Sequence, residues 1–186
     1  LSPGSAPIHP PLPGIDLPGI FSVRTVADAK NMREWLERDN LRSAMNEYSG
    51  GNTISKAKRA VVIGGGFIGL EMVENLVERG LEVTLVEKLG QVMPPLDPEM
   101  ARLVKRYMKK RGIKVKVSDG VAGFRQAENG SLEVLTEAGK VYPADIVIMA
   151  IGVKPELALA KMAGIEIGQR GGIRVNEHMY TSDPDI

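Results

Sequence analysis

A glycine-rich turn constrains this chain more than any other feature, because it joins a short apolar run to a helical pattern. The run Ala60–Ile63 leads directly into Gly64, Gly66 and Gly69, which have the spacing Gly-x-Gly-x-x-Gly. Between a strand and a helix, this spacing is typical of sites that hold the pyrophosphate of a dinucleotide. The alternative is a glycine-rich turn that serves only the packing of the helix.

The three glycines have separate physical roles in such a site. Gly64 lets the chain turn sharply off the strand, Gly66 leaves room for a pyrophosphate against the backbone, and Gly69 lets the helix pack closely on the strand. The diphosphate then lies on the free N–H groups at the positive end of the helix. Gly65 belongs to the same turn and is a further candidate for cofactor binding.

The pattern continues beyond the turn. A helix is predicted up to Arg79, and Gly80 is suited to end it in a left-handed conformation. Leu81–Val86 is predicted as a second buried strand, and Glu87 follows it directly. A carboxylate about 20 residues beyond the glycines is where the two hydroxyls of a ribose are held. The apolar stripe of the helix is expected to consist of Ile68, Met72, Val73, Leu76 and Val77.

Composition limits the other classes of function. With 186 residues and a net charge of +1, the chain favours neither nucleic acid nor an anionic membrane as a partner. Its longest apolar stretch, Ile146–Val153, is too short to span a bilayer. Without cysteine the chain has no disulfide, thiolate metal site or thiol nucleophile, and its sequence shows no other metal-ligand cluster. We expect a cytoplasmic protein that holds no metal.

The N-terminal segment is rich in proline and is expected to be extended. Six prolines occur within residues 1–19, which excludes a helix. The segment is either a disordered tail or a crossover between two domains, and interspersed apolar residues favour the crossover. These apolar residues are Ile8, Leu12, Ile15 and Leu17.

A helix is predicted next, from Thr25 to about Asn40. Thr25 and Asp28 have the spacing of a capping box. The expected apolar face consists of Val26, Ala29, Trp35 and Leu36. A polar loop without evident chemistry is predicted at 46–53.

The chain after Glu87 departs from simple parallel winding. A loop at 88–96 precedes a helix whose start is marked by Asp97, Pro98 and Glu99. One face of this helix carries Met100, Leu103, Val104, Tyr107 and Met108. Short strands are predicted at 113–117, 121–126, 132–136 and 140–142, with a hairpin turn at Asn129–Gly130. An antiparallel meander therefore takes the place of a crossover helix.

The continuous apolar run Asp145–Ile151 is typical of a strand buried on both faces. Ligands of open parallel sheets bind at the carboxyl ends of strands, so Ile151 and Gly152 are candidate nucleotide contacts. The alternative at Gly152 is a simple turn from strand to loop. A short helix at 155–163 and strand-like pieces at 165–167 and 173–175 complete the predicted elements. The expected fold is α/β: a Rossmann-like, three-layer domain with a parallel sheet and an antiparallel β-meander crossover.

In this order, the features resemble the NAD-binding domain of the FAD-dependent pyridine nucleotide–disulfide oxidoreductases. The resemblance covers essentially the whole chain and rests on Leu1–Gly4, Val62–Glu71, Ala150–Pro155 and Thr181–Ile186. Two further segments are most similar to the branch of coenzyme A-disulfide reductases, NADH-dependent persulfide reductases and NADH oxidases. These segments are Gln91–Asp97 and Gly171–Asn176.

The resemblance implies a division of the chain. Residues 20–175 would form the NAD(P)-binding domain, and residues 1–19 and 176–186 would be stubs that join it to an FAD domain. That domain would bring its own glycine fingerprint and a reactive cysteine, which this chain lacks. FAD and dimerisation domains of the same polypeptide are thus the implied partners, in a homodimer. The implied substrate is a small-molecule disulfide or persulfide, such as coenzyme A disulfide.

The resemblance also implies roles for three residues at the start of the fingerprint helix. Phe67 would cover the flavin ring and move aside for nicotinamide, Glu71 would lie near the nicotinamide carboxamide, and Ile68 would line the same pocket. Simpler interpretations are a hydrophobic residue at a helix start for Phe67 and a favourable first-turn acid for Glu71. No catalytic residue is expected within this chain.

The implied cofactors are NAD(H) or NADP(H), together with FAD in the complete enzyme. Glu87 would repel the 2′-phosphate of NADPH, whereas Lys88 beside it works in the opposite direction. A nucleotide-sensing module without redox turnover is the alternative of another class. A self-sufficient dehydrogenase is disfavoured, because there is no Tyr-x-x-x-Lys pair and both His9 and His178 lie in or near the predicted stubs.

Overall fold

A computed structural model describes residues 2–46, 57–128 and 130–186 of the chain. These residues divide into two compact units, which we describe separately. The larger unit is His9–Ile151, and the smaller one combines Leu1–Ile8 with Gly152–Ile186. The polar loop predicted at 46–53 lies outside the described residues from position 47 onward.

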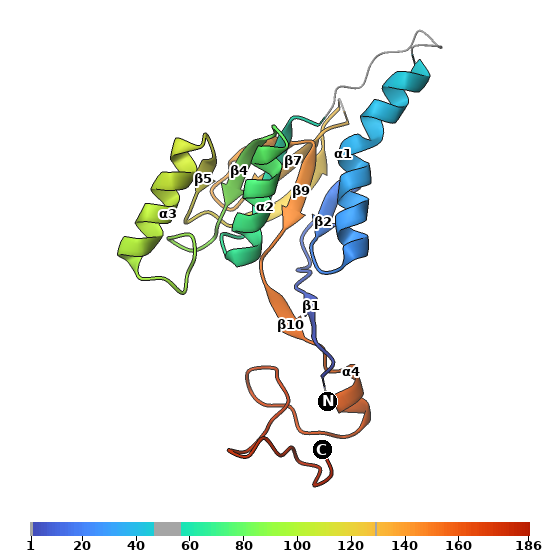
Figure 1. Ribbon diagram of the computed structural model, residues 1–186, viewed down its shortest axis with the longest axis vertical. Coiled ribbons are helices and arrows are strands. Elements are labelled where there is room, and N and C mark those ends of the chain that lie inside the picture. Colours follow the sequence, from blue (N-terminus) through green and yellow to red (C-terminus); the bar gives the residue numbers. More distant parts are fainter. Residues whose placement is uncertain (1, 47–56, 129) are drawn as a thin grey trace. The chain divides into compact units, whose positions relative to one another are not determined.

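A five-stranded parallel sheet forms the centre of the larger unit (Figure 1). Its strand order is β2-β9-β3-β4-β5, so the fingerprint strand is central. The strands are β2 (Ile20–Ser22), β9 (Ile146–Met149), β3 (Arg59–Ile63), β4 (Glu82–Val86) and β5 (Lys114–Lys116). The helices are α1 (Val26–Asn46), α2 (Phe67–Glu78) and α3 (Pro98–Lys110).

Alternating side chains of the central strands bury two separate cores, one on each face of the sheet. On β3, Ala60 and Val62 pack in the core that includes Leu76 of α2. Val61 and Ile63 point the other way, into a second core on the opposite face. That second core is closed by the meander β6 (Val121–Gln126), β7 (Leu132–Thr136) and β8 (Val141–Ala144).

The meander is a three-stranded antiparallel sheet in the order β6-β7-β8. Gly130 of the predicted hairpin turn has a φ of 81°, while Asn129 lies outside the described residues. Helices, parallel sheet and meander thus form three layers. This arrangement confirms the predicted Rossmann-like fold with a β-meander crossover.

The N-terminal end of the larger unit is packed against the meander. Ile15 is buried and belongs to the meander core together with Phe124, and Phe124 N–H donates to Pro13 O at 2.7 Å. These contacts rule out a disordered tail for this stretch. Whether residues 1–19 and 176–186 lead into a flavin domain stays a prediction.

The first helix differs from its predicted form. The capping box is present, since Thr25 N–H donates to Asp28 Oδ2 and Asp28 N–H donates to Thr25 Oγ1. However, α1 continues to Asn46, and Val26 at its start is 87% exposed. Met32, about one and a half turns later, is buried, because this part of α1 reaches the core on the helix side of the sheet.

The apolar face predicted for α3 is only partly buried. Met108 lies in the core on the helix side of the sheet. Met100, Leu103 and Tyr107 are exposed. The helix packs over β5, the edge strand of the sheet, so its outer side has no strand beneath it.

The smaller unit is built on a short antiparallel pair that the sequence did not predict. β1 (Ser5–Pro7) pairs with β10 (Val153–Pro155), and α4 (Ala158–Met162) follows. The helix predicted at 155–163 is shorter than expected, because its first residue belongs to β10. The strand-like pieces predicted at 165–167 and 173–175 meet in one isolated bridge, Ile167–Ile173. Throughout the described ranges, the helices are too short or too polar to cross a membrane.

Candidate functional site

The fingerprint turn connects β3 to α2, and its geometry requires glycine at two positions. Gly64 has a φ of 103°, and a Cβ there would lie 2.3 Å from Ala150 O at the end of β9. A Cβ at Gly69 would lie 1.9 Å from Gly64 O. The turn is therefore sharp and the helix lies against the strand, as the spacing predicts for these two positions.

The backbone around Gly66 is open. No atom lies within 4 Å of the Cβ position at Gly66, which is the N-cap of α2 and has a φ of −81°. No side chain caps the helix, so the N–H groups of its first turn have no side-chain acceptor. A negatively charged group fits such a site because it accepts these hydrogen bonds and favours the positive helix end.

Glu87, at the end of β4, lies against the same turn. Its Oε2 accepts a hydrogen bond of 2.5 Å from Gly65 N–H, and its Oε1 accepts one of 2.7 Å from Leu89 N–H. The residue is 7% exposed. Each carboxylate oxygen retains a second lone pair. The carboxylate is thus held beside the open backbone of the turn, with acceptor capacity left for hydroxyl groups.

The loop after β4 packs against the fingerprint turn. Met93 N–H donates to Gly65 O at 2.7 Å, and Val92 is fully buried. Gln91 Nε2 donates to Leu96 O at 2.8 Å, which links the middle of the loop to its C-terminal end. The residues of this segment predicted a loop and did not predict its packing. The apolar Val92, two residues before Pro94, was the available signal.

Polar residues of the meander and of the segment before it contact the residues that follow β4. Asp119 N–H donates to Glu87 O at 3.1 Å, and Asp119 Oδ1 accepts from Ala138 N–H at 3.2 Å. Lys88 Nζ pairs with Glu137 Oε1 at 2.8 Å. Burial and the nearby Asp119 carboxylate both raise the pKa of Tyr142. None of these contacts was predicted, because they join segments far apart in sequence.

The other predicted site residues lie at the edges of this turn. Phe67 is 64% exposed, and Ile68 is 41% exposed rather than buried in the helix stripe as predicted. Ile68 faces outward because Val73 and Leu76 form the side of α2 that meets the sheet. Glu71 lies beyond the first turn of α2, which contains no acid. The simpler interpretation of Glu71 as a first-turn acid is therefore wrong.

The carboxyl end of β9 is close to the fingerprint turn. Ala150 N–H donates to Ile63 O at 2.7 Å, and Ile151, the next residue, is 36% exposed. Gly152 has a φ of 108° and belongs to the smaller unit, where its carbonyl accepts from Ile8 N–H at 3.0 Å. A turn from strand to loop has this conformation, and the nucleotide contact of Gly152 stays a prediction.

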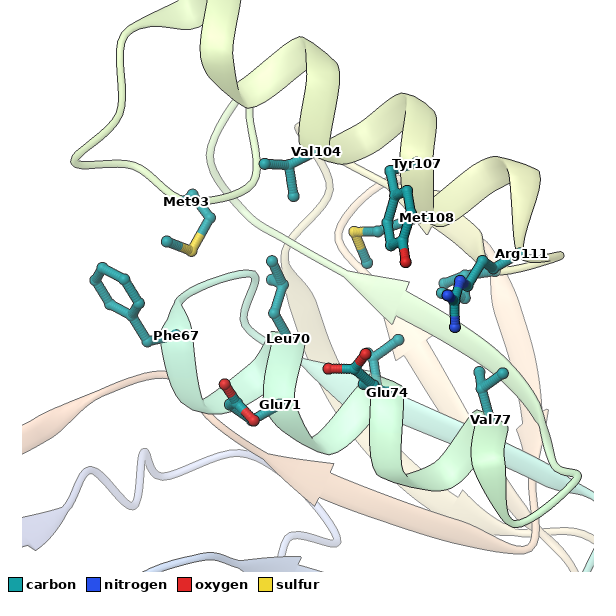
Figure 2. Close-up of a pocket in the computed structure, with 12 residues that line it drawn as sticks. Phe67, Leu70, Glu71, Glu74, Val77, Met93, Val104, Tyr107, Met108 and Arg111 are labelled. Carbon is teal, nitrogen blue, oxygen red and sulfur yellow. The ribbon is translucent and has the colours of Figure 1, made fainter.

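A groove of about 260 Å³ lies between α2 and α3 (Figure 2). Phe67 and Met93 lie at one end of it and Arg111 at the other. Its walls are mainly apolar, with Glu71 and Glu74 on the α2 side. Glu87 and the glycines of the turn do not line this groove, whereas Phe67 and Glu71, two of the predicted site residues, do.

The described ranges contain no group of three or more His, Asp or Glu residues placed to hold a metal ion. His9 is paired with Asp16 at 3.2 Å and His178 with Glu177 at 3.6 Å, in each case on the surface. The open amides and the Glu87 carboxylate are instead suited to a phosphate and a sugar.

Comparisons with known proteins agree with this chemistry. The family model described as pyridine nucleotide-disulphide oxidoreductase matches residues 1–186. A protein named NADH oxidase from Methanocaldococcus jannaschii is 41% identical over 187 residues, which cover 100% of this chain and 38% of that protein.

Two solved structures share the fold over nearly the whole chain. Reduced Bacillus anthracis CoADR-RHD has a TM-score of 0.83 at 44% identity, over 98% of this chain and 29% of its own. An NAD-dependent persulfide reductase from A. fulgidus has a TM-score of 0.82 at 36% identity, over 97% of this chain and 30% of its own. The chain thus spans about a third of the length of these relatives.

Proposed function

Because the chain belongs to the pyridine nucleotide–disulphide oxidoreductase family, we propose that it is the NADH-binding part of a flavoprotein oxidoreductase. The observation that carries this proposal is the meeting of Glu87 with the fingerprint turn. The same few atoms offer uncapped N–H groups for a pyrophosphate and a carboxylate for a ribose.

In this proposal the turn and the first residues of α2 hold the nucleotide. The pyrophosphate accepts hydrogen bonds from the N–H groups that follow Gly66, and Glu87 accepts hydrogen bonds from the adenosine ribose. When bound, the nicotinamide supplies a hydride, and the flavin of a further domain receives it. The contribution of this chain is binding and orientation, because the redox chemistry belongs to the two cofactors.

Phe67, Ile68 and Glu71 are proposed to border the nicotinamide end of the nucleotide. Their positions at the start of α2 support this role, since Phe67 and Ile68 are exposed beside the open backbone of Gly66. Ile151, which follows β9, is proposed as a further contact, and a contact from Gly152 stays a prediction. Phe67 would cover the flavin ring in the absence of nicotinamide.

The electron acceptor of the complete enzyme is proposed to be a small disulfide or persulfide, such as coenzyme A disulfide. A structural relative at 36% identity is named a persulfide reductase, which supports this class. The reactive cysteine and the FAD-binding residues would come from other parts of the polypeptide, since this chain has no cysteine. The complete enzyme is proposed to be a homodimer.

A second candidate acceptor is dioxygen. The protein at 41% identity is named an NADH oxidase, and this name favours oxygen over a sulfur compound. The proposed role of this chain is the same in both cases, because the acceptor would react at the flavin and not at the nucleotide.

The experiment that tests the proposed function uses the full-length polypeptide. We expect calorimetric titration to show NADH binding, and stopped-flow absorbance to show flavin reduction by NADH without any acceptor. Assays with oxygen, coenzyme A disulfide and a persulfide then identify the acceptor. Binding of NADH without flavin reduction would favour a nucleotide-sensing module instead.

A further inference from the structure

A lysine beside the proposed ribose ligand is held by a carboxylate from another part of the fold. Lys88 follows Glu87 at the end of β4, and its Nζ lies 2.8 Å from Glu137 Oε1. Glu137 comes directly after β7 in the meander, 49 residues away in sequence. Their side chains are 71% and 52% exposed, so solvent weakens the pair.

Backbone contacts fix Glu137 near the end of β4. Glu137 N–H donates to Gly120 O at 2.8 Å, while Asp119 N–H donates to Glu87 O at 3.1 Å. The Glu137 side chain lies over Gly120, since a Cβ at Gly120 would be 2.6 Å from the Glu137 carboxyl carbon. The carboxylate is therefore held where Lys88 reaches it.

We propose that Glu137 is a positioning residue that disfavours NADPH by holding Lys88 away from the 2′-phosphate. This inference rests on the proposed function, in which Glu87 binds the ribose. Lys88 directly follows the proposed ribose ligand and is a cation available to a 2′-phosphate. To pair with it, Lys88 must first leave Glu137, and this cost applies to NADPH alone. NADH has no 2′-phosphate and leaves the pair intact.

The size of the effect follows from the exposure of the pair. An exposed ion pair is worth about 0.2–1 kcal/mol, which corresponds to a change of up to about five-fold in a dissociation constant. We therefore expect Glu137→Gln to tighten NADPH binding up to about five-fold. NADH binding should stay within about two-fold of the wild type.

The test is a double-mutant cycle in the full-length polypeptide, with dissociation constants for NADH and NADPH measured by calorimetry. The variants are Glu137→Gln, Lys88→Gln and the two together. Glu133→Gln is the matched control: it removes one negative charge from the same hairpin, where Glu133 pairs with Arg125. We expect the control to leave the ratio of the two constants unchanged.

The cycle separates the possible results. If Glu137 acts through Lys88, Glu137→Gln tightens NADPH binding in the wild type and has no effect once Lys88 is glutamine. Equal tightening in both backgrounds would mean direct repulsion by Glu137 and would overturn the inference. No tightening at all would also overturn it, while NADH binding to the same samples would leave the proposed function standing. A wild-type protein that binds neither nucleotide would contradict both the inference and the proposed function.

Discussion

Glu87 and Gly65, 22 residues apart in sequence, are joined by a hydrogen bond of 2.5 Å between the buried carboxylate and a backbone N–H of the fingerprint turn. The bond links the end of β4 to the turn after β3, so the acid and the open amides form one surface. Glu87 therefore has two roles in our account. It supports the turn in the free protein and it binds the ribose of the nucleotide.

The first prediction concerns the choice of nucleotide. Replacing Glu87 by arginine would leave the N–H groups of Gly65 and Leu89 without an acceptor. Glu87→Gln is the milder test, because its single amide oxygen still accepts from one of them. We expect NADH to bind about ten-fold more weakly, because a neutral amide accepts weaker hydrogen bonds than a carboxylate. NADPH should lose less affinity, since a repulsive charge is removed.

Calorimetric titration with both nucleotides measures this change. Glu82→Gln is the control, because Glu82 is an exposed acid at the start of β4 that pairs with Lys114. An unchanged ratio of NADH to NADPH affinity in Glu87→Gln would show that Glu87 does not contact the ribose.

A second prediction concerns the packing of α2 on β3. Gly69→Ala places a methyl group 1.9 Å from Gly64 O, so the helix must move away from the strand. We expect the free energy of unfolding to fall by about 2–4 kcal/mol. Chemical denaturation measures it, and Gly66→Ala is the control because its Cβ meets no atom within 4 Å. Equal stability of the two variants would contradict the observed geometry.

A third prediction concerns acid stability through Asp145, which precedes β9. Burial alone would raise the pKa of Asp145, but the Arg59 guanidinium and the N–H groups of Lys58 and Arg59 lower it below its ordinary value of 3.8. A lowered pKa in the folded state means that the ionised carboxylate stabilises the fold. This stabilisation is complete well above pH 3.8 and is lost as the pH falls through the folded-state pKa.

Asp145→Asn should therefore lower the free energy of unfolding by about 1–3 kcal/mol at pH 7. The difference between wild type and variant should shrink below about pH 4, where the unfolded chain begins to bind a proton at this carboxyl while the folded protein binds it only at a lower pH. Urea unfolding between pH 7 and pH 3 measures this. A difference that stays constant across this range would assign the effect to shape rather than to charge.

The strand–turn–helix core was predictable because its signals are local. Gly64 and Gly69 occupy positions where only glycine fits, and the apolar run before them is the central strand. The bounds of β6 and β7 also match the prediction, because alternation and the turn between them are local features. The three-layer arrangement then follows from a strand buried on both faces.

Elements that depend on distant partners were missed. β2 has only three residues and exists because it pairs with β9, far along the chain. Val26 was predicted to be buried and Met32 was overlooked, because the start of α1 extends beyond the sheet. Helical spacing identifies an apolar stripe but not how much of it finds a partner.

In the candidate site, too, local features could be predicted and contacts between distant segments could not. The position of Glu87 at a strand end could be predicted from spacing, whereas its hydrogen bond to Gly65 could not. The pair Lys88–Glu137 and the contact between Asp119 and Glu87 come from the meander and the segment before it, which lie beside the end of β4. No periodicity in the sequence reports such contacts. The nucleotide roles of these residues stay predictions.

The most direct test of the account is the NADH affinity of Gly66→Ala. The variant should fold with nearly wild-type stability, because Gly66 has an ordinary φ of −81° and open space around its Cβ position. The added methyl group lies on the surface where the pyrophosphate is proposed to rest. We predict at least about a ten-fold loss of NADH affinity by calorimetry, or about 1.4 kcal/mol. A stably folded Gly66→Ala that binds NADH as tightly as the wild type would contradict the account.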